Sequence, residues 1–139
     1  MDIWLRFVDL DADPEYYEWV CYIADEGRWV QFARSLALHD TVSRSFLFDL
    51  HVILAPLFQF TNYLVFQIAG VSLFTSRIFT AVCGSALIIL FWLRLRLAVS
   101  SQALLLGLAM ITAQTDLVVL SKIAVPEMAV LFFQLVSIL

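Results

Sequence analysis

Charged residues are concentrated in the first third of this chain, and that segregation limits the folds open to it. Ten of the twelve acidic residues lie in positions 1 to 51. Residues 52 to 139 carry only six charged side chains, which are Arg77, Arg94, Arg96, Asp116, Lys122 and Glu127. A soluble domain has about 25% charged residues and spreads them over its surface, whereas this chain has 14%. We therefore expect an all-α protein that is embedded in a lipid bilayer over most of its length.

Long uncharged stretches predict the membrane helices. A helix that spans the bilayer needs ~20 apolar residues. Transmembrane helices are predicted at residues 77–97 and 100–120, and a truncated one at 126–139. Because the chain ends inside an apolar stretch, we expect a fragment that lacks a helix before Met1 and further helices after Leu139.

The stretch at residues 52–71 has two interpretations. It is long and uncharged, which favours a helix that crosses the membrane. Its polar residues Gln59, Asn62 and Gln67 share one side of a helical wheel, which favours a helix lying in the interface. Hydropathy alone leaves both alternatives open.

The polar first part, residues 1–51, predicts an outer-face loop with short interfacial helices. Asp13-Pro14 is a helix-start signal, and aromatic residues fill the helix predicted at 14–23. A second helix is predicted at 26–38, with Asp25 at its N-terminus. Its apolar and polar residues fall on opposite faces, as in a helix on a membrane surface.

Basic residues next to a span predict its orientation. Arg94 and Arg96 flank the helix at 77–97, so the positive-inside rule places them in the cytoplasm. Arg77, Lys122 and Glu127 would then gather at the outer face. The acidic pair Asp25-Glu26 would lie on that face only if residues 52–71 do not cross the membrane.

Some functions are disfavoured. The chain has no basic run of the kind that binds nucleic acid. Cys21 and Cys83 lie in different environments and have no neighbours at metal-ligand spacing, so we expect neither a disulfide between them nor a metal site at either cysteine.

An ordered set of short motifs resembles a known family. The set comprises DEG-x-W-x2-FAR at residues 25–34, His51, Pro56-Leu57, Gly70, Arg77, and Ser-Lys-Ile-Ala-Val-Pro-Glu-Met at 121–128. In order and spacing it resembles the N-terminal part of the GT-C membrane glycosyltransferases. This superfamily includes protein O-mannosyltransferases, the lipid A aminoarabinose transferase and the RgtA/B/C/D-like group. The likeness covers about residues 20–135, although the family's double proline reads Ala55-Pro56 here.

The resemblance implies a topology and a reaction. It implies that residues 1–76 form an outer region with helices along the membrane, with the carboxylates facing the periplasm or the extracellular side of a bacterial inner membrane. The implied enzyme transfers a sugar, with inversion, from a polyprenyl-phosphate donor to a hydroxyl of a lipid, glycan or protein acceptor. We expect this fragment alone to be inactive.

Such a reaction requires a base and a cation. A carboxylate removes the proton of the acceptor hydroxyl, and Arg or Lys stabilises the departing phosphate. By resemblance, Asp25 is the expected general base and Glu26 its catalytic neighbour. Glu127, Lys122 and Arg77 are the expected substrate-binding residues, the last two for the carrier phosphate. Whether Glu26 or Glu127 holds a divalent cation stays open.

Structural roles compete with these assignments. Asp25 could simply cap a helix, and Glu26 or Glu127 could complement a helix dipole. Arg77 and Lys122 could be interfacial anchors. His39 and His51 are expected to be solvated loop residues, and Trp29 and Phe32 membrane-facing anchors.

Two other functions remain as alternatives. In a transporter or channel fragment, Asp116, Lys122 and Glu127 would line an ion or proton path. The chain could also be a non-catalytic membrane scaffold. The aromatic-rich polar region with its acidic pair favours the enzyme, because a transporter has no need of it.

Overall fold

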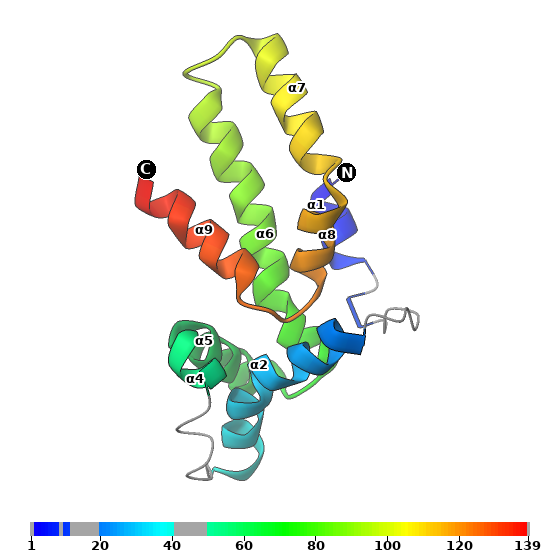
Figure 1. Cartoon of the computed structure of the whole chain (residues 1–139), viewed down its shortest axis with the longest axis vertical. Helices are drawn as coiled ribbons and strands as arrows, with labels where there is room; N and C mark the ends of the chain where they lie inside the picture. Colours follow the sequence, from blue (N-terminus) through cyan, green and yellow to red (C-terminus); the bar gives the residue numbers. More distant parts are fainter. Residues whose placement is uncertain (1, 9, 12–19, 41–49, 139) are drawn as a thin grey trace.

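The computed structural model describes residues 2–8, 10–11, 20–40 and 50–138, and every regular element in them is a helix. The elements are α1 (Asp2–Phe7), α2 (Val20–His39), α4 (Leu50–Leu54), α5 (Pro56–Ala69), α6 (Leu73–Leu95), α7 (Ser101–Thr112), α8 (Thr115–Lys122) and α9 (Glu127–Ile138). The expected all-α class is confirmed for this part of the chain. Figure 1 shows α6 as the central rod, with α2, α4 and α5 gathered at the end where it begins.

A capping box fixes the start of α6. The Ser72 hydroxyl accepts a hydrogen bond from the backbone N–H of Thr75, and the Thr75 hydroxyl accepts one from the N–H of Ser72. Gly70 ends α5 with φ 80°, a conformation that favours glycine. The helix therefore begins at Leu73, four positions before the predicted start at residue 77. The earlier start could have been predicted from the sequence, because Ser-x-x-Thr is a variant of the capping box.

Of the described helices, α6 is the one that by length and composition could cross a bilayer alone. Its 23 residues span ~35 Å, more than the ~30 Å of a hydrocarbon core. The pair α7 and α8 would count as a second crossing if taken as one broken span, and α9 is a shorter apolar helix.

The transmembrane helix predicted at residues 100–120 is not one continuous helix in the structure. The chain breaks after α7, and α8 continues at an angle of 55°. Gln114 between them is extended, with ψ 102°. The Thr112 hydroxyl donates to the carbonyl of Ala109, a local bond that competes with helix continuation. Asp116 therefore lies in the first turn of a new helix, exposed, where its charge complements the helix dipole.

The predicted break between helices at 14–23 and 26–38 is absent from the structure. Helix α2 runs without a break from Val20 to His39, so the backbone of Asp25 lies inside the helix and does not cap it. The side chains of residues 20–25, including Asp25 and Cys21, lie outside the described part of the structure. Most of the helix predicted at 14–23 lies outside it too, as does Asp13-Pro14.

The stretch at 52–71 does not form one continuous helix. It is divided between α4 and α5 at Ala55, and Pro56 is the first residue of α5. A proline at this position is well tolerated because the first N–H of a helix has no intrahelical partner. The 14 residues of α5 reach ~21 Å, which is shorter than a hydrocarbon core.

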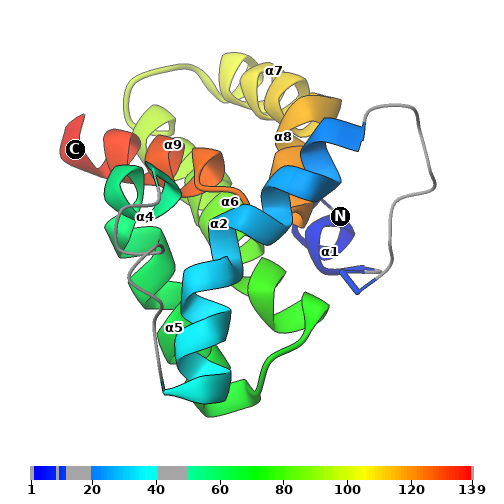
Figure 2. The ribbon, with the colours of Figure 1, turned by 60° about the horizontal axis from the view of Figure 1, so that its bottom comes forward.

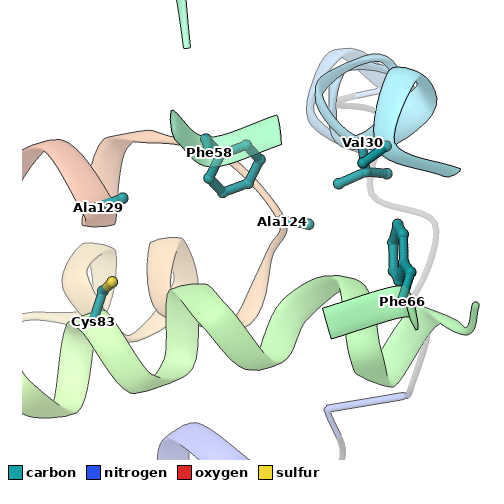
Figure 3. Packing of buried hydrophobic residues seen from close by; sticks show 7 residues of the cluster. Val30, Phe58, Phe66, Cys83, Ala124 and Ala129 are labelled. Carbon is teal, nitrogen blue, oxygen red and sulfur yellow. The ribbon is translucent and has the colours of Figure 1, made fainter. Parts of the chain in front are cut away.

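A small apolar cluster joins α2 and α5 to α6 and α9. Val30 and Ala33 from α2 meet Phe58 and Phe66 from α5, and Cys83, Ala124 and Ala129 complete the cluster from α6 and the region of α9 (Figure 3). The Phe58 and Phe79 rings lie 5.9 Å apart between centroids. Trp29, expected to face lipid, is half-buried against this cluster.

Polar side chains are buried, and large apolar side chains exposed, to an extent that is unusual for a soluble domain. The buried polar or charged side chains are Arg6, Glu26, Gln59, Asn62, Thr75, Ser76, Arg77, Thr80, Ser85 and Ser121. Large apolar side chains are exposed on every helix from α4 to α9, and α7 buries none of its residues. Exposed apolar surface of this extent marks an interaction with lipid or protein.

Four helices converge at Gly84 near the middle of α6. Arg6 of α1 is fully buried there, and its Nη1 donates to the carbonyl of Leu117 at 3.0 Å and to the Ser121 hydroxyl at 2.7 Å. A Cβ on Gly84 would lie 2.7 Å from the Cβ of Ser121, 2.9 Å from Arg6 Nη1 and 3.1 Å from Met128 Cε. The missing side chain thus permits α1, α8 and α9 to approach α6.

We expect Gly84→Ala to lower the free energy of unfolding by about 1–3 kcal/mol through overpacking. Gly107→Ala in α7 is the matched control, because nothing lies within 4 Å of a Cβ built there. The control should gain about 1 kcal/mol of helix propensity. Unfolding of both variants in detergent micelles measures the difference. Equal stabilisation of the two would contradict the close packing at Gly84.

Candidate functional site

A buried ion pair joins α2 to α6. Glu26 lies in the second turn of α2 and Arg77 in the second turn of α6. Arg77 Nε donates to Glu26 Oε1 at 2.6 Å, and Nη2 donates to Oε2 at 2.8 Å. Only 4% of Glu26 and 2% of Arg77 is exposed. The geometry is bidentate, the arrangement in which arginine binds a carboxylate most strongly.

Two backbone groups complete the hydrogen bonding of the pair. The N–H of Ala124, in the link between α8 and α9, donates to Glu26 Oε1 at 2.7 Å. Arg77 Nη1 donates to the carbonyl of Leu10 at 3.0 Å. Charges taken out of water need this kind of compensation. The pair therefore ties four segments of the chain together at the beginning of α6.

These contacts determine what each side chain can still do. Both oxygens of Glu26 accept hydrogen bonds, so a divalent cation would have to compete with the Arg77 guanidinium. All three nitrogens of Arg77 have protein partners. Contact of Arg77 with a donor phosphate stays a prediction, and it would require this network to rearrange.

A cavity of about 300 Å³ lies against the pair. Its lining comprises Glu26, Gly27, Val30, Arg34, Phe66, Val71, Ser72, Leu73, Ser76 and Arg77. Arg34 is exposed and forms no ion pair with any described residue. With one carboxylate and two guanidinium groups, the lining has a net charge of +1.

The lining contains both polar and apolar residues. The polar residues among them include Arg34, Ser72 and Ser76, and the lining reaches the start of α6, where the positive end of the helix dipole lies. The apolar residues are Val30, Phe66, Val71 and Leu73. Such a cavity can accept an anionic group that carries an apolar chain.

The other predicted residues lie outside this lining. Glu127 is exposed in the first turn of α9, three positions after Ala124, and therefore in the same half of the bundle. Lys122 is half-buried in the last turn of α8. Their predicted roles as substrate ligands stay predictions. Asp25 lies next to Glu26 in α2, and its side chain is outside the described residues.

The remaining candidates are placed as follows. His51, expected in a solvated loop, is half-buried in α4, and its ring meets that of Trp29 edge-on at 4.6 Å between centroids. His39 is the exposed last residue of α2. Within the described residues, no group of three His, Cys, Asp or Glu side chains could hold a metal ion.

Sequence reasoning missed part of the site. The role of Arg34 in the cavity had a signal, because it lies eight positions after Glu26, about two helical turns, and so near the same side. The serines at 72 and 76 are likewise one turn apart at the start of α6. The contributions of the Leu10 carbonyl and the Ala124 N–H could not be predicted, since nearly every residue has the same backbone groups.

Comparison with known proteins does not identify the chain: no family model, no curated protein and no solved structure matches it.

Proposed function

We propose that this chain is part of an integral, polytopic membrane protein of a bacterial inner membrane. Three observations support the proposal. Helix α6 is long and apolar enough to cross a bilayer. The buried side chains include two arginines and two amides, while large apolar side chains face outward. Every regular element of the described residues is a helix, the structure that satisfies its own backbone hydrogen bonds in lipid.

The position of the ion pair along α6 supports an outer location for the acidic pair. Arg77 is in the second turn of α6, whereas Arg94 and Arg96 lie at its other end. The helix is ~35 Å long, so its ends would lie at opposite faces of the membrane. With Arg94 and Arg96 in the cytoplasm by the positive-inside rule, Glu26 would lie on the periplasmic or extracellular side.

We infer that the protein is a glycosyltransferase of the GT-C type that uses a polyprenyl-phosphate sugar. The observation that carries this inference is the buried Glu26–Arg77 pair, which fixes the acidic segment of α2 beside a cavity of net positive charge. A carboxylate for proton transfer and a cation for a phosphate are the two requirements of the reaction.

The residues divide the work as follows. The acceptor hydroxyl gives its proton to the carboxylate of Asp25 while its oxygen bonds to the anomeric carbon. On the opposite face of the sugar, the bond from that carbon to the phosphate oxygen breaks, and the carrier phosphate leaves with the electron pair. Arg34 compensates the negative charge that develops on it. Glu26 and Arg77 hold α2 in place, and they are positioning residues.

The transporter alternative has less support. Asp116 and Glu127 are exposed, and no ion pair joins either of them to Lys122 in the part of the chain that the structure describes. A proton path through a bilayer requires such groups to face a bundle interior or a water-filled cavity, and none of the three lines the cavity described above.

Sugar transfer in membranes from cells that produce the whole protein of which this chain is part tests the proposal. We expect Arg34→Gln to lower kcat/KM for a polyprenyl-phosphate sugar by about 10- to 100-fold, the worth of a hydrogen bond to a charged group. Arg34→Lys should recover part of the loss. Arg96→Gln removes the same charge at the other end of α6 and should have no effect. Transfer by Arg34→Gln at the wild-type rate would remove Arg34 from the mechanism.

A further inference from the structure

Arg6 of α1 is a charged side chain that lies deep in the bundle. None of its surface is exposed, and its Nη1 lies 2.9 Å from the position that a Cβ on Gly84 would take. Gly84 is ~16 Å along α6 from Leu73, the first residue of that helix. If α6 crosses the bilayer, Arg6 therefore lies near the middle of the ~30 Å hydrocarbon core. A charge at that depth is costly and marks a functional role.

Arg6 fixes the end of α8 to α1. Its Nη1 donates to the carbonyl of Leu117 at 3.0 Å and to the hydroxyl of Ser121 at 2.7 Å. Both acceptors belong to α8, one turn apart, and Ser121 is fully buried in the last turn of that helix. Figures 1 and 2 show α1 beside α8 from two directions. The contacts of one guanidinium nitrogen thus hold the end of α8 in place.

The end of α8 leads directly to the carboxylate of Glu26. Three positions after Ser121, the N–H of Ala124 donates to Glu26 Oε1 at 2.7 Å. Between them Ile123 is already extended, with φ −115° and ψ 147°, so the link has little slack. A displacement of Ser121 would therefore carry the Ala124 N–H away from Glu26.

The same arginine stands close to the other half of the ion pair. The carbonyl of Leu10, four positions after Arg6, accepts a hydrogen bond from Arg77 Nη1 at 3.0 Å. Leu10 is 1% exposed. The contacts of Arg6 and those of the Glu26–Arg77 pair therefore form a closed ring through α1, α8, the α8–α9 link, α2 and α6. Both backbone partners of the pair lie within four residues of the Arg6–Ser121 hydrogen bond.

We propose that Arg6 is a positioning residue for the acidic segment of α2. By fixing the end of α8 it keeps the Ala124 N–H on Glu26, and this contact holds α2, with Asp25 and Arg34, in place at the start of α6. The link to catalysis rests on the sugar transfer proposed above, in which Asp25 is the base. The positioning itself rests only on the hydrogen bonds of the ring.

Ser121 and Ser85 offer a matched pair of variants. Both hydroxyls are buried and donate to a carbonyl of their own helix, that of Val118 at 2.7 Å and that of Ala81 at 2.8 Å. Ser121 in addition accepts the hydrogen bond from Arg6. Ser121→Ala therefore loosens Arg6 from α8 while retaining the arginine, and Ser85→Ala removes an equivalent hydroxyl from α6.

Hydrogen exchange of the Ala124 amide measures the positioning, in the whole chain held in detergent micelles. The amide of Ile88, buried in α6, is the reference for global unfolding. Relative to Ile88, we expect Arg6→Met to accelerate exchange at Ala124 by about 10-fold or more, the worth of a hydrogen bond to a charged group. Ser121→Ala should accelerate it by about threefold or more, because one of two acceptors remains. Arg6→Lys should recover part of the protection.

Ser85→Ala should leave exchange at Ala124 unchanged. Wild-type exchange at Ala124 in Ser121→Ala, or equal acceleration of Ala124 and Ile88, would overturn the positioning role and leave Arg6 a packing residue. If Arg6→Met does not fold, Ser121→Ala decides the question.

Sugar transfer by the whole protein of which this chain is part tests the link to catalysis separately. Ser121→Ala should lower kcat by about 10-fold at unchanged KM, because misplaced groups lose contacts made in the transition state. Ser85→Ala should transfer sugar normally. Faster exchange at Ala124 with normal transfer by Ser121→Ala would overturn the link to catalysis. Absence of transfer by the wild type would instead overturn the proposed function and leave the positioning result standing.

Discussion

Asp25→Asn should reduce sugar transfer from a polyprenyl-phosphate donor by about 10²- to 10⁴-fold, the usual contribution of a general base. The reason is the state of its neighbour. Both oxygens of Glu26 accept hydrogen bonds from Arg77 or Ala124, so we expect Asp25 rather than Glu26 to take the proton. Transfer of labelled sugar, measured with saturating acceptor, gives the rate.

Asp116→Asn provides the matched control. It makes the same change at an exposed carboxylate in the first turn of α8, outside the cavity lining. If the protein is a glycosyltransferase, we expect this variant to transfer sugar normally and Asp25→Asn to insert into the membrane as the wild type does. The transporter alternative predicts the reverse sensitivity in an ion-flux assay. Normal transfer by Asp25→Asn would exclude Asp25 as the base.

Arg77→Met should lower the free energy of unfolding by about 3–5 kcal/mol, because it leaves the Glu26 carboxylate buried without its partner. The substitution also removes the hydrogen bond that Arg77 Nη1 donates to the carbonyl of Leu10. Unfolding in mild detergent measures the loss. Arg96→Met serves as the control, since Arg96 is exposed and lies 4.9 Å from the Trp92 ring centroid, a contact of about 0.5–1 kcal/mol at an exposed site.

The double variant Glu26→Gln/Arg77→Met distinguishes the cost of an unpaired buried charge from the cost of lost side-chain packing. Removing both charges leaves no isolated ion, so the double variant should be more stable than Arg77→Met alone. A double-mutant cycle gives the coupling energy directly. A loss below about 1 kcal/mol for Arg77→Met, the range of surface ion pairs, would contradict the burial of the pair.

Much of the architecture follows from local pattern. Charge segregation predicts an all-helical chain, and the described part is helical throughout. The acidic pair and Arg77 stand out in the sequence as charged residues at the edges of apolar stretches. Hydropathy is a sum over neighbouring residues, so it identifies helices and their composition well. Helix breaks are less visible: the interruption at Gln114 contains neither proline nor glycine.

The sequence by itself thus determined the helical class, the apolar stretches and the residues able to carry charge chemistry. Only the tertiary structure decided that Glu26 meets Arg77 across 51 positions and the Ala124 N–H across 98. It also decided that α5 ends after 14 residues and that Arg34 lines the cavity. The physical reason is that local free energies act between residues a few positions apart, whereas burying a charge depends on partners that only folding brings together.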